Sequence, residues 1–148
     1  MTVADQIEAT ITALQATLTD AGITVLEAPT ADNPQQYALV GWDNPDNADQ
    51  MAVTGDFTWA YIGHTTYDGM FTISVTTVGW NGDSLLPQAR TDALACMSAV
   101  ETAVKADPTL GGVILFASTF TGVQLRQVND SQGSRAYCHF GLECRIRV

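Results

Sequence analysis

The last fourteen residues, Arg135 to Val148, constrain the fold most, because apolar and polar side chains alternate along them almost without a break. The apolar set is Ala136, Cys138, Phe140, Leu142, Cys144, Ile146 and Val148, and the polar set is Arg135, Tyr137, His139, Glu143, Arg145 and Arg147. This period of two predicts a β-strand with one buried face and one wet face. Such a strand would span about 46 Å, whereas strands usually have five or six residues, so we expect part of it to extend past its own sheet and to invite a partner.

The length and charge of the chain limit the classes of protein to which it can belong. The 148 residues are typical of a single domain, here 1–148, and only 15% of them are charged. Residues 1–89 contain eleven Asp and Glu and no Lys or Arg, so the net charge of −10 comes from this first part. That charge repels phosphate backbones and argues against nucleic-acid binding through a basic surface, although it is compatible with DNA passing nearby.

The ends of the chain and the cysteines indicate where the protein is made. Residues 1–10 contain Asp5 and Glu8 but no basic residue, unlike a secretory signal, and no apolar run is long enough for a membrane span. Three cysteines without an export signal fit a reducing compartment. Cys138 and Cys144 lie on one face of the same strand about 20 Å apart, so they cannot form a disulfide there, and we interpret all three cysteines as core residues.

Apolar spacing predicts two helices and several strands. The first helix should begin after Thr2 and stop at Gly22, and the second should run from Leu86 to Asp107. The expected strands cover 23–27, 37–42, 57–61, 71–77, 113–120 and 123–128, with a kink at Gly122, and 135–148; a flexible loop is expected at 43–56. This order predicts an α+β fold, a mostly antiparallel sheet with two helices packed on one face.

The sequence contains no convincing catalytic pattern. Five acids and one histidine have oxygen and nitrogen atoms suited to a cation, but their spacing fits no EF-hand loop, and a solvated acidic loop is the simpler interpretation; they are Asp43, Asp46, Asp49, Asp56, Asp68 and His64. Cys138 and His139 are neighbours on a strand and face opposite ways, which spoils a nucleophile pair. No Gly-x-Ser-x-Gly elbow or phosphate-binding glycine loop is present. We therefore predict no enzyme, no cofactor and no metal site.

Aromatic and basic residues suggest contacts with other molecules. Trp42, Trp59, Tyr61 and Phe71 are typical of a core, although a ligand pocket is the alternative. Trp80 lies beside Gly79 and Gly82 in a polar turn and is a candidate anchor for a neighbour. The remaining interface candidates are the arginines Arg126, Arg135, Arg145 and Arg147 and the acids Asp43, Asp46, Asp49 and Asp56. Opposite charges at the two ends of the chain suit head-to-tail pairing, or the arginines only solvate the outer sheet face.

Motifs in the second half resemble a known family. Residues 104–113 read Val-Lys-Ala-Asp-Pro-Thr-Leu-Gly-Gly-Val, and residues 122–127 read Gly-Val-Gln-Leu-Arg-Gln, before a polar turn and the long closing strand. This arrangement resembles the tail terminator proteins of long-tailed (siphovirus-type) phages, particularly those of actinobacterial hosts. The absence of basic residues before Arg90 and the Asn-Pro-Asp-Asn loop after Trp42 depart from the family pattern.

The resemblance implies a structural virion protein made in the host cytoplasm and placed at the head-proximal end of the phage tail. It implies a homo-hexameric ring that caps the tail tube protein, ends elongation and offers a surface to the head-tail connector protein, while DNA passes through. It implies no cofactor, no catalysis and no membrane. The alternatives are a neighbouring connector, meaning a head-closure or tail-completion protein, and a monomeric small-ligand-binding α+β module with a pocket at Trp59, Tyr61 and Phe71.

Overall fold

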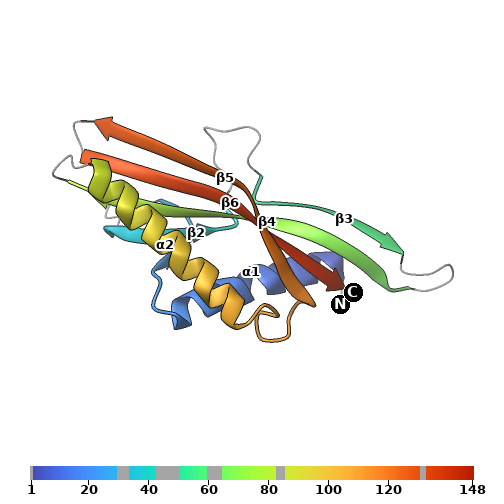
Figure 1. The fold of residues 1–148 in the computed structure, drawn as a ribbon. Helices are drawn as coiled ribbons and strands as arrows, with labels where there is room; N and C mark the ends of the chain where they lie inside the picture. Colours follow the sequence, from blue (N-terminus) through green and yellow to red (C-terminus); the bar gives the residue numbers. More distant parts are fainter. Residues whose placement is uncertain (1, 30–33, 43–50, 60–64, 83–85, 131–132) are drawn as a thin grey trace.

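The computed structural model describes residues 2–29, 34–42, 51–59, 65–82, 86–130 and 133–148 (Figure 1). The elements in chain order are α1 (Val3–Asp20), β1 (Val25–Leu26), β2 (Gln36–Val40), β3 (Val53–Trp59), β4 (Tyr67–Asn81), α2 (Leu86–Ala106), β5 (Phe116–Asp130) and β6 (Gly133–Arg147). Two helices and a mostly antiparallel sheet make the predicted α+β fold, which is confirmed.

The six strands form one sheet in the order β1-β2-β4-β6-β5. Strand β3 pairs with β4 as well, on the same side of β4 as β2 but farther along it. Every pairing is antiparallel except that of β1 with β2. The sheet is therefore built around two central 15-residue strands, β4 and β6, which pair from Asp68 opposite Arg147 to Asn81 opposite Ser134.

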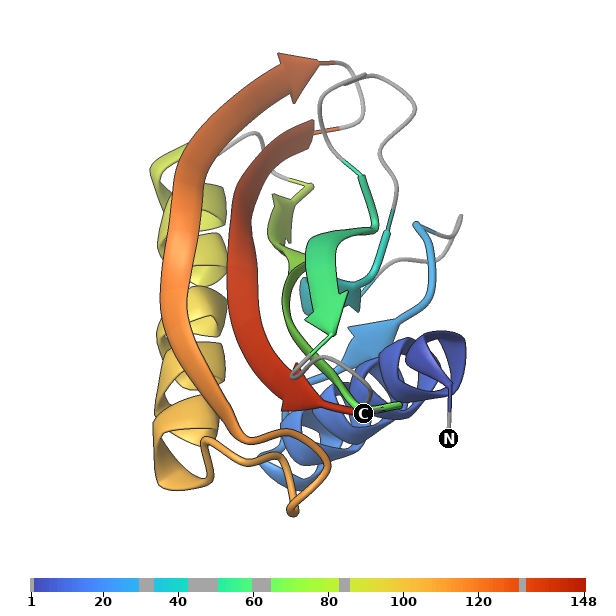
Figure 2. The same ribbon diagram turned by 90° about the vertical axis from the view of Figure 1, so that its right-hand side faces the viewer.

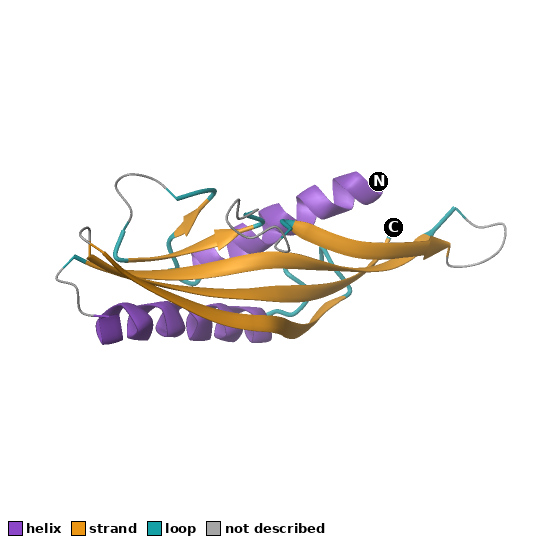
Figure 3. Cartoon of the chain, turned by 90° about the horizontal axis from the view of Figure 1, so that it is seen from above, coloured by secondary structure: helices purple, strands orange, loops and turns teal. Residues whose placement is uncertain are grey.

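Both helices contribute to one hydrophobic core on the same side of the sheet. Leu14 and Leu18 of α1 and Val100 and Val104 of α2 belong to a single buried cluster with alternate residues of the central strands, among them Phe71, Ile73, Val75, Cys138, Phe140, Leu142, Cys144 and Ile146. Figure 3 shows α2 running along the long strands on one side of the sheet. The apolar half of the predicted alternation in the last strand is thus the half that faces the helices.

The first helix begins and ends as its sequence predicts. Thr2 is the N-cap: its Oγ1 accepts the Asp5 amide at 3.1 Å, and its own amide donates to the Asp5 carboxylate at 2.8 Å, which completes a capping box. The bond from the Thr2 amide, followed by a second bond from the Thr2 hydroxyl to the same carboxylate, lowers the pKa of Asp5. The helix ends where Gly22 adopts a φ of +84° and the Ile23 amide donates back to the Leu18 carbonyl.

The second helix lies unusually close to strand β4. A Cβ atom at Gly79 would lie 2.1 Å from the carbonyl oxygen of Ala89 and 2.7 Å from the amide nitrogen of Ala93. Thr77 Oγ1 donates to the Ala93 carbonyl at 2.9 Å, and Gln36 Nε2 donates to the Asp92 carbonyl at 2.7 Å. Small residues on helix and strand therefore allow the backbones to meet, and polar side chains of the sheet fasten the helix there.

The C-terminal strand differs from the most specific expectation drawn from the sequence. It was expected to extend past its own sheet, but β6 is paired on both sides, with β4 and β5, over nearly its whole length. Beyond Arg147, Val148 and Tyr67 exchange two backbone hydrogen bonds. The expectation is wrong because alternation reports which face of a strand is buried and says nothing about whether its edges are paired.

Other boundaries differ by a few residues. The expected loop at 43–56 ends earlier, because residues 53–56 belong to β3; residues 43–50 lie outside the described residues. Strand β5 begins at Phe116 and not at 113, because residues 108–114 form turns held by Asp107, whose carboxylate accepts the amides of Thr109 and Gly111. The kink predicted at Gly122 is confirmed: its φ is +60°, and the β5–β6 register shifts between Thr121 and Gln124.

The cysteines are core residues, as predicted. Cys96, Cys138 and Cys144 are buried and form no disulfide. Burial raises the pKa of the Cys96 thiol to about 11 and that of Cys144 to about 12. Both thiols therefore stay protonated at neutral pH and pack as small apolar groups.

Candidate assembly surface

The outer edge of β5 is the longest unpaired strand edge among the described residues. This 15-residue strand pairs with β6 on one side and has no described strand on the other (Figures 1 and 2). An unpaired edge presents a row of backbone donors and acceptors to any extended segment. Natural proteins usually protect such edges with Lys, Pro or charges, but β5 contains no Lys or Pro, and Arg126 is its only charged residue before Asp130.

Strand β5 also exposes apolar side chains. Val123 is 54% exposed and Leu125 is 42% exposed, directly after the bulge at Gly122. At the start of the strand, Leu115 and Phe116 are exposed as well. Exposed apolar side chains along an unpaired strand are typical of a protein-interaction surface.

The sheet face turned away from the helices, here called the far face, carries most of the basic residues. The β4–β6 register places Arg135, Arg145 and Arg147 on it. Arg126 of β5 lies on it as well, because it is opposite Tyr137, whose side chain is on the same face as those arginines. Four of the six Lys and Arg residues of the chain therefore lie on the far face. This arrangement is compatible with both interpretations made from the sequence, which are head-to-tail pairing between copies and solvation of the outer sheet face.

The charged residues of the far face differ in their partners. Arg147 binds the Asp68 carboxylate with two hydrogen bonds, of 2.6 and 3.0 Å, which lower the pKa of Asp68. The Arg145 guanidinium lies over the Phe116 ring, 5.9 Å from its centre. The Asp56 side chain, on β3, has no hydrogen bond or ion pair among the described residues.

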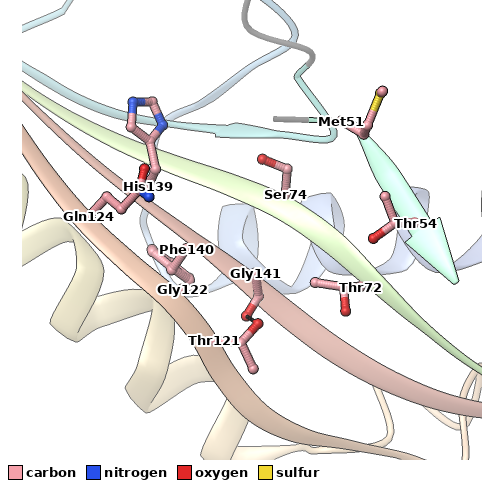
Figure 4. Close-up of a pocket in the computed structure, with 10 residues that line it drawn as sticks. All are labelled: Met51, Thr54, Thr72, Ser74, Thr121, Gly122, Gln124, His139, Phe140 and Gly141. Atoms are coloured by element: carbon pink, nitrogen blue, oxygen red, sulfur yellow. Dashed lines mark hydrogen bonds between the residues drawn. The ribbon is translucent and has the colours of Figure 1, made fainter. Parts of the chain in front are cut away.

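Three hollows lined by described residues follow one another along the far face. The middle one is lined by small polar residues, including Thr54, Thr72, Ser74 and Thr121, around Gly141 (Figure 4). The largest, of about 600 Å³, lies at the β3 end, where Met70, Leu115 and Phe116 are bordered by Asp56 and Arg145. The face is therefore concave and polar in the middle, with an apolar floor near the start of β5.

The third hollow lies at the opposite end of the far face and combines aromatic and basic residues. Its lining includes Trp42, Arg126, Arg135, Tyr137 and His139. The His139 ring stacks parallel to that of Tyr137, with 6.3 Å between ring centres, and His139 Nδ1 lies 2.7 Å from Thr76 Oγ1 in a hydrogen bond. Burial, followed by the charge of Arg126, lowers the pKa of His139, so this imidazole is neutral at pH 7.

The remaining candidates are only partly placed. Trp80 is half-buried on the far face opposite Arg135, and Asp43, Asp46 and Asp49 lie outside the described residues. Phe71 belongs to the core beside Phe57, with ring centres 6.2 Å apart, and it lines none of the three hollows described above. The Trp59 side chain and Tyr61 are not described.

The free edge of β5 was not among the features predicted from the sequence. A signal was present: Val123 and Leu125 alternate with polar residues in a strand that has no Lys or Pro and only Arg126 as a charge before Asp130. Among the described residues, no three His, Cys, Asp or Glu side chains are grouped to hold a metal ion, and no helix is long and apolar enough to cross a membrane. No protein-family model matches the chain, and no curated protein matches it by sequence.

Proposed function

We propose that the chain is a structural virion protein that caps a phage tail tube as a homo-hexameric ring, ends tube elongation and offers a surface for head attachment. The observation that carries this proposal is the unpaired, weakly protected and partly apolar edge of β5, which is suited to binding another chain through its backbone. The number of six and the place at the tail come from the family resemblance of residues 104–113 and 122–127.

A ring needs a head-to-tail contact between two different surfaces. In such a ring the β5 edge of one copy meets a different surface of the next copy, and repetition of this contact closes into a ring when the rotation allows. The net charge of −10 disfavours adhesion of DNA and is compatible with the genome passing through the ring. The proposed role requires no reactive group, cofactor or membrane.

Removing the gene from a phage that encodes this chain tests the proposal. Without a cap, tube elongation has no stop, so electron microscopy should show tails of irregular length that are not joined to heads. A head-closure or tail-completion protein, the nearest alternative, would give tails of normal and uniform length that fail to join heads. Normal, infectious particles from the deletion strain would refute the proposal.

A further inference from the structure

The four strands β3-β4-β6-β5 form a continuous run that begins and ends with an unpaired edge. Strand β3 pairs only with β4, and β5 pairs only with β6, among the described strands. The two open edges therefore lie at opposite ends of this run (Figure 1). A second copy that follows in the same orientation would present its β3 edge to the β5 edge of the first.

Strand directions favour this pairing. All three pairings in the run are antiparallel, so β3 and β6 run one way while β4 and β5 run the other. Because the number of strands is even, β3 of the next copy would run antiparallel to β5 when a rotation that preserves strand direction relates the copies. The sheet would then continue between copies without any change in its pairing pattern.

Charge supplies the register. Arg126 is the only charged residue of β5 before Asp130, and Asp56 is the only charged residue of β3. Both side chains lie on the far face, and neither side chain has a hydrogen bond or ion pair among the described residues. Within one copy, Asp56 is level with Met70 of β4, and Arg126 is level with Val78 of the same strand. These two positions are roughly 26 Å apart along β4, so the two side chains cannot meet within one copy.

The same register also brings apolar side chains together. If Arg126 lies opposite Asp56 of the next copy in an antiparallel pair, Leu125 lies opposite Phe57. Both of these side chains are on the helix side of their sheets, since Leu125 pairs with Cys138 and Phe57 pairs with Gly69. The exposed Leu125 would thus gain an aromatic neighbour on its own face.

We infer that β5 of one copy pairs antiparallel with β3 of a second copy, with Arg126 opposite Asp56 and Leu125 opposite Phe57. This inference rests on the proposed function, because it names the contact that joins neighbouring copies in the ring. The partner is a second copy of this chain, selected by the complementary charges and the matching strand directions of the two edges.

Exchanging the two charges tests the inference in a phage whose own copy of the gene is deleted and supplied from a plasmid. Asp56→Arg alone and Arg126→Glu alone should each lower infectious yield by about 100-fold or more, because like charges then face each other at every contact. The double variant carrying both changes should restore the yield. Co-expression of the two single variants should restore it as well, since alternating copies are complementary.

The controls separate this inference from the proposed function. Normal yield from both single variants, or no rescue by the double variant, would overturn the strand pairing while leaving the need for the gene intact.

If the deletion phage plates normally, the proposed function fails, and oxidation of the purified Asp56→Cys/Arg126→Cys variant decides the pairing. Disulfide-linked oligomers support it, and monomers alone overturn it. The Asp5→Cys/Arg126→Cys variant, with one cysteine on the exposed start of α1, is the matched control and should stay monomeric.

Discussion

Replacing Gly79 with valine is expected to destabilise the folded chain by about 3 kcal/mol or more, the upper part of the range for overpacked sites. The first added atom would lie 2.1 Å from the Ala89 carbonyl oxygen and 2.7 Å from the Ala93 amide nitrogen. These are backbone atoms, so the helix itself must move, and the nearby hydrogen bond from Thr77 to Ala93 would be strained with it. Stability totals only about 5–15 kcal/mol for a typical domain, so this loss is a large share.

Thermal unfolding followed by circular dichroism measures the effect. The midpoint should fall by roughly 6–12 °C for Gly79→Val and by less for Gly79→Ala, which adds one atom at the same place. Gly82→Ala is the matched control, because among the described residues a Cβ there meets only the Trp80 ring, at 3.3 Å, and should change the midpoint little. Equal midpoints for Gly79→Val and the natural chain would mean that α2 does not lie on β4 as described.

Placing lysines at Val123 and Leu125 is expected to abolish assembly while leaving the fold intact. Both side chains are exposed, so the change costs little core packing, but charge on an unpaired edge strand is the device by which proteins prevent strand addition. The Val123→Lys/Leu125→Lys variant should unfold within about 2 °C of the natural chain, because surface changes are usually within about 0.5 kcal/mol. It should not support particle formation when it is the only copy in the infected cell.

The matched control is Leu94→Lys. Leu94 is as exposed as Leu125, at 42%, but belongs to α2 and not to the edge strand. This variant should support normal particle yield. Equal yields from the double-lysine variant and from Leu94→Lys would show that the β5 edge plays no part in assembly.

Local patterns predicted the elements of the fold well. The caps at Thr2 and Gly22, the helix over 86–107 and the kink at Gly122 follow from short-range chemistry, and each is confirmed. Pairing between strands is a long-range property. The alternation of the last strand therefore gave the buried face correctly, but it could not show that β4 and β5 cover both of its edges.

The candidate surface was predicted in composition but not in arrangement. Alternation alone placed Arg135, Arg145 and Arg147 on one outer face. Adding Arg126 to that face required the register through the bulge after Thr121, which no local pattern supplies. The position of Asp56 at the edge opposite β5 likewise depends on the order of the strands, because that order places β3 at the end of the run β3-β4-β6-β5.

Imaging purified tails by electron cryo-microscopy tests the central proposal most directly. The tails come from a phage that encodes this chain, carrying it with a small exposed tag. We expect one ring of this chain at the head-proximal end of each tail, with neighbouring copies joined through the edges of their sheets, and no copies elsewhere along the tube. Density for this chain on detached heads and not on the tails, along the whole tube, or nowhere in the particle would contradict the account.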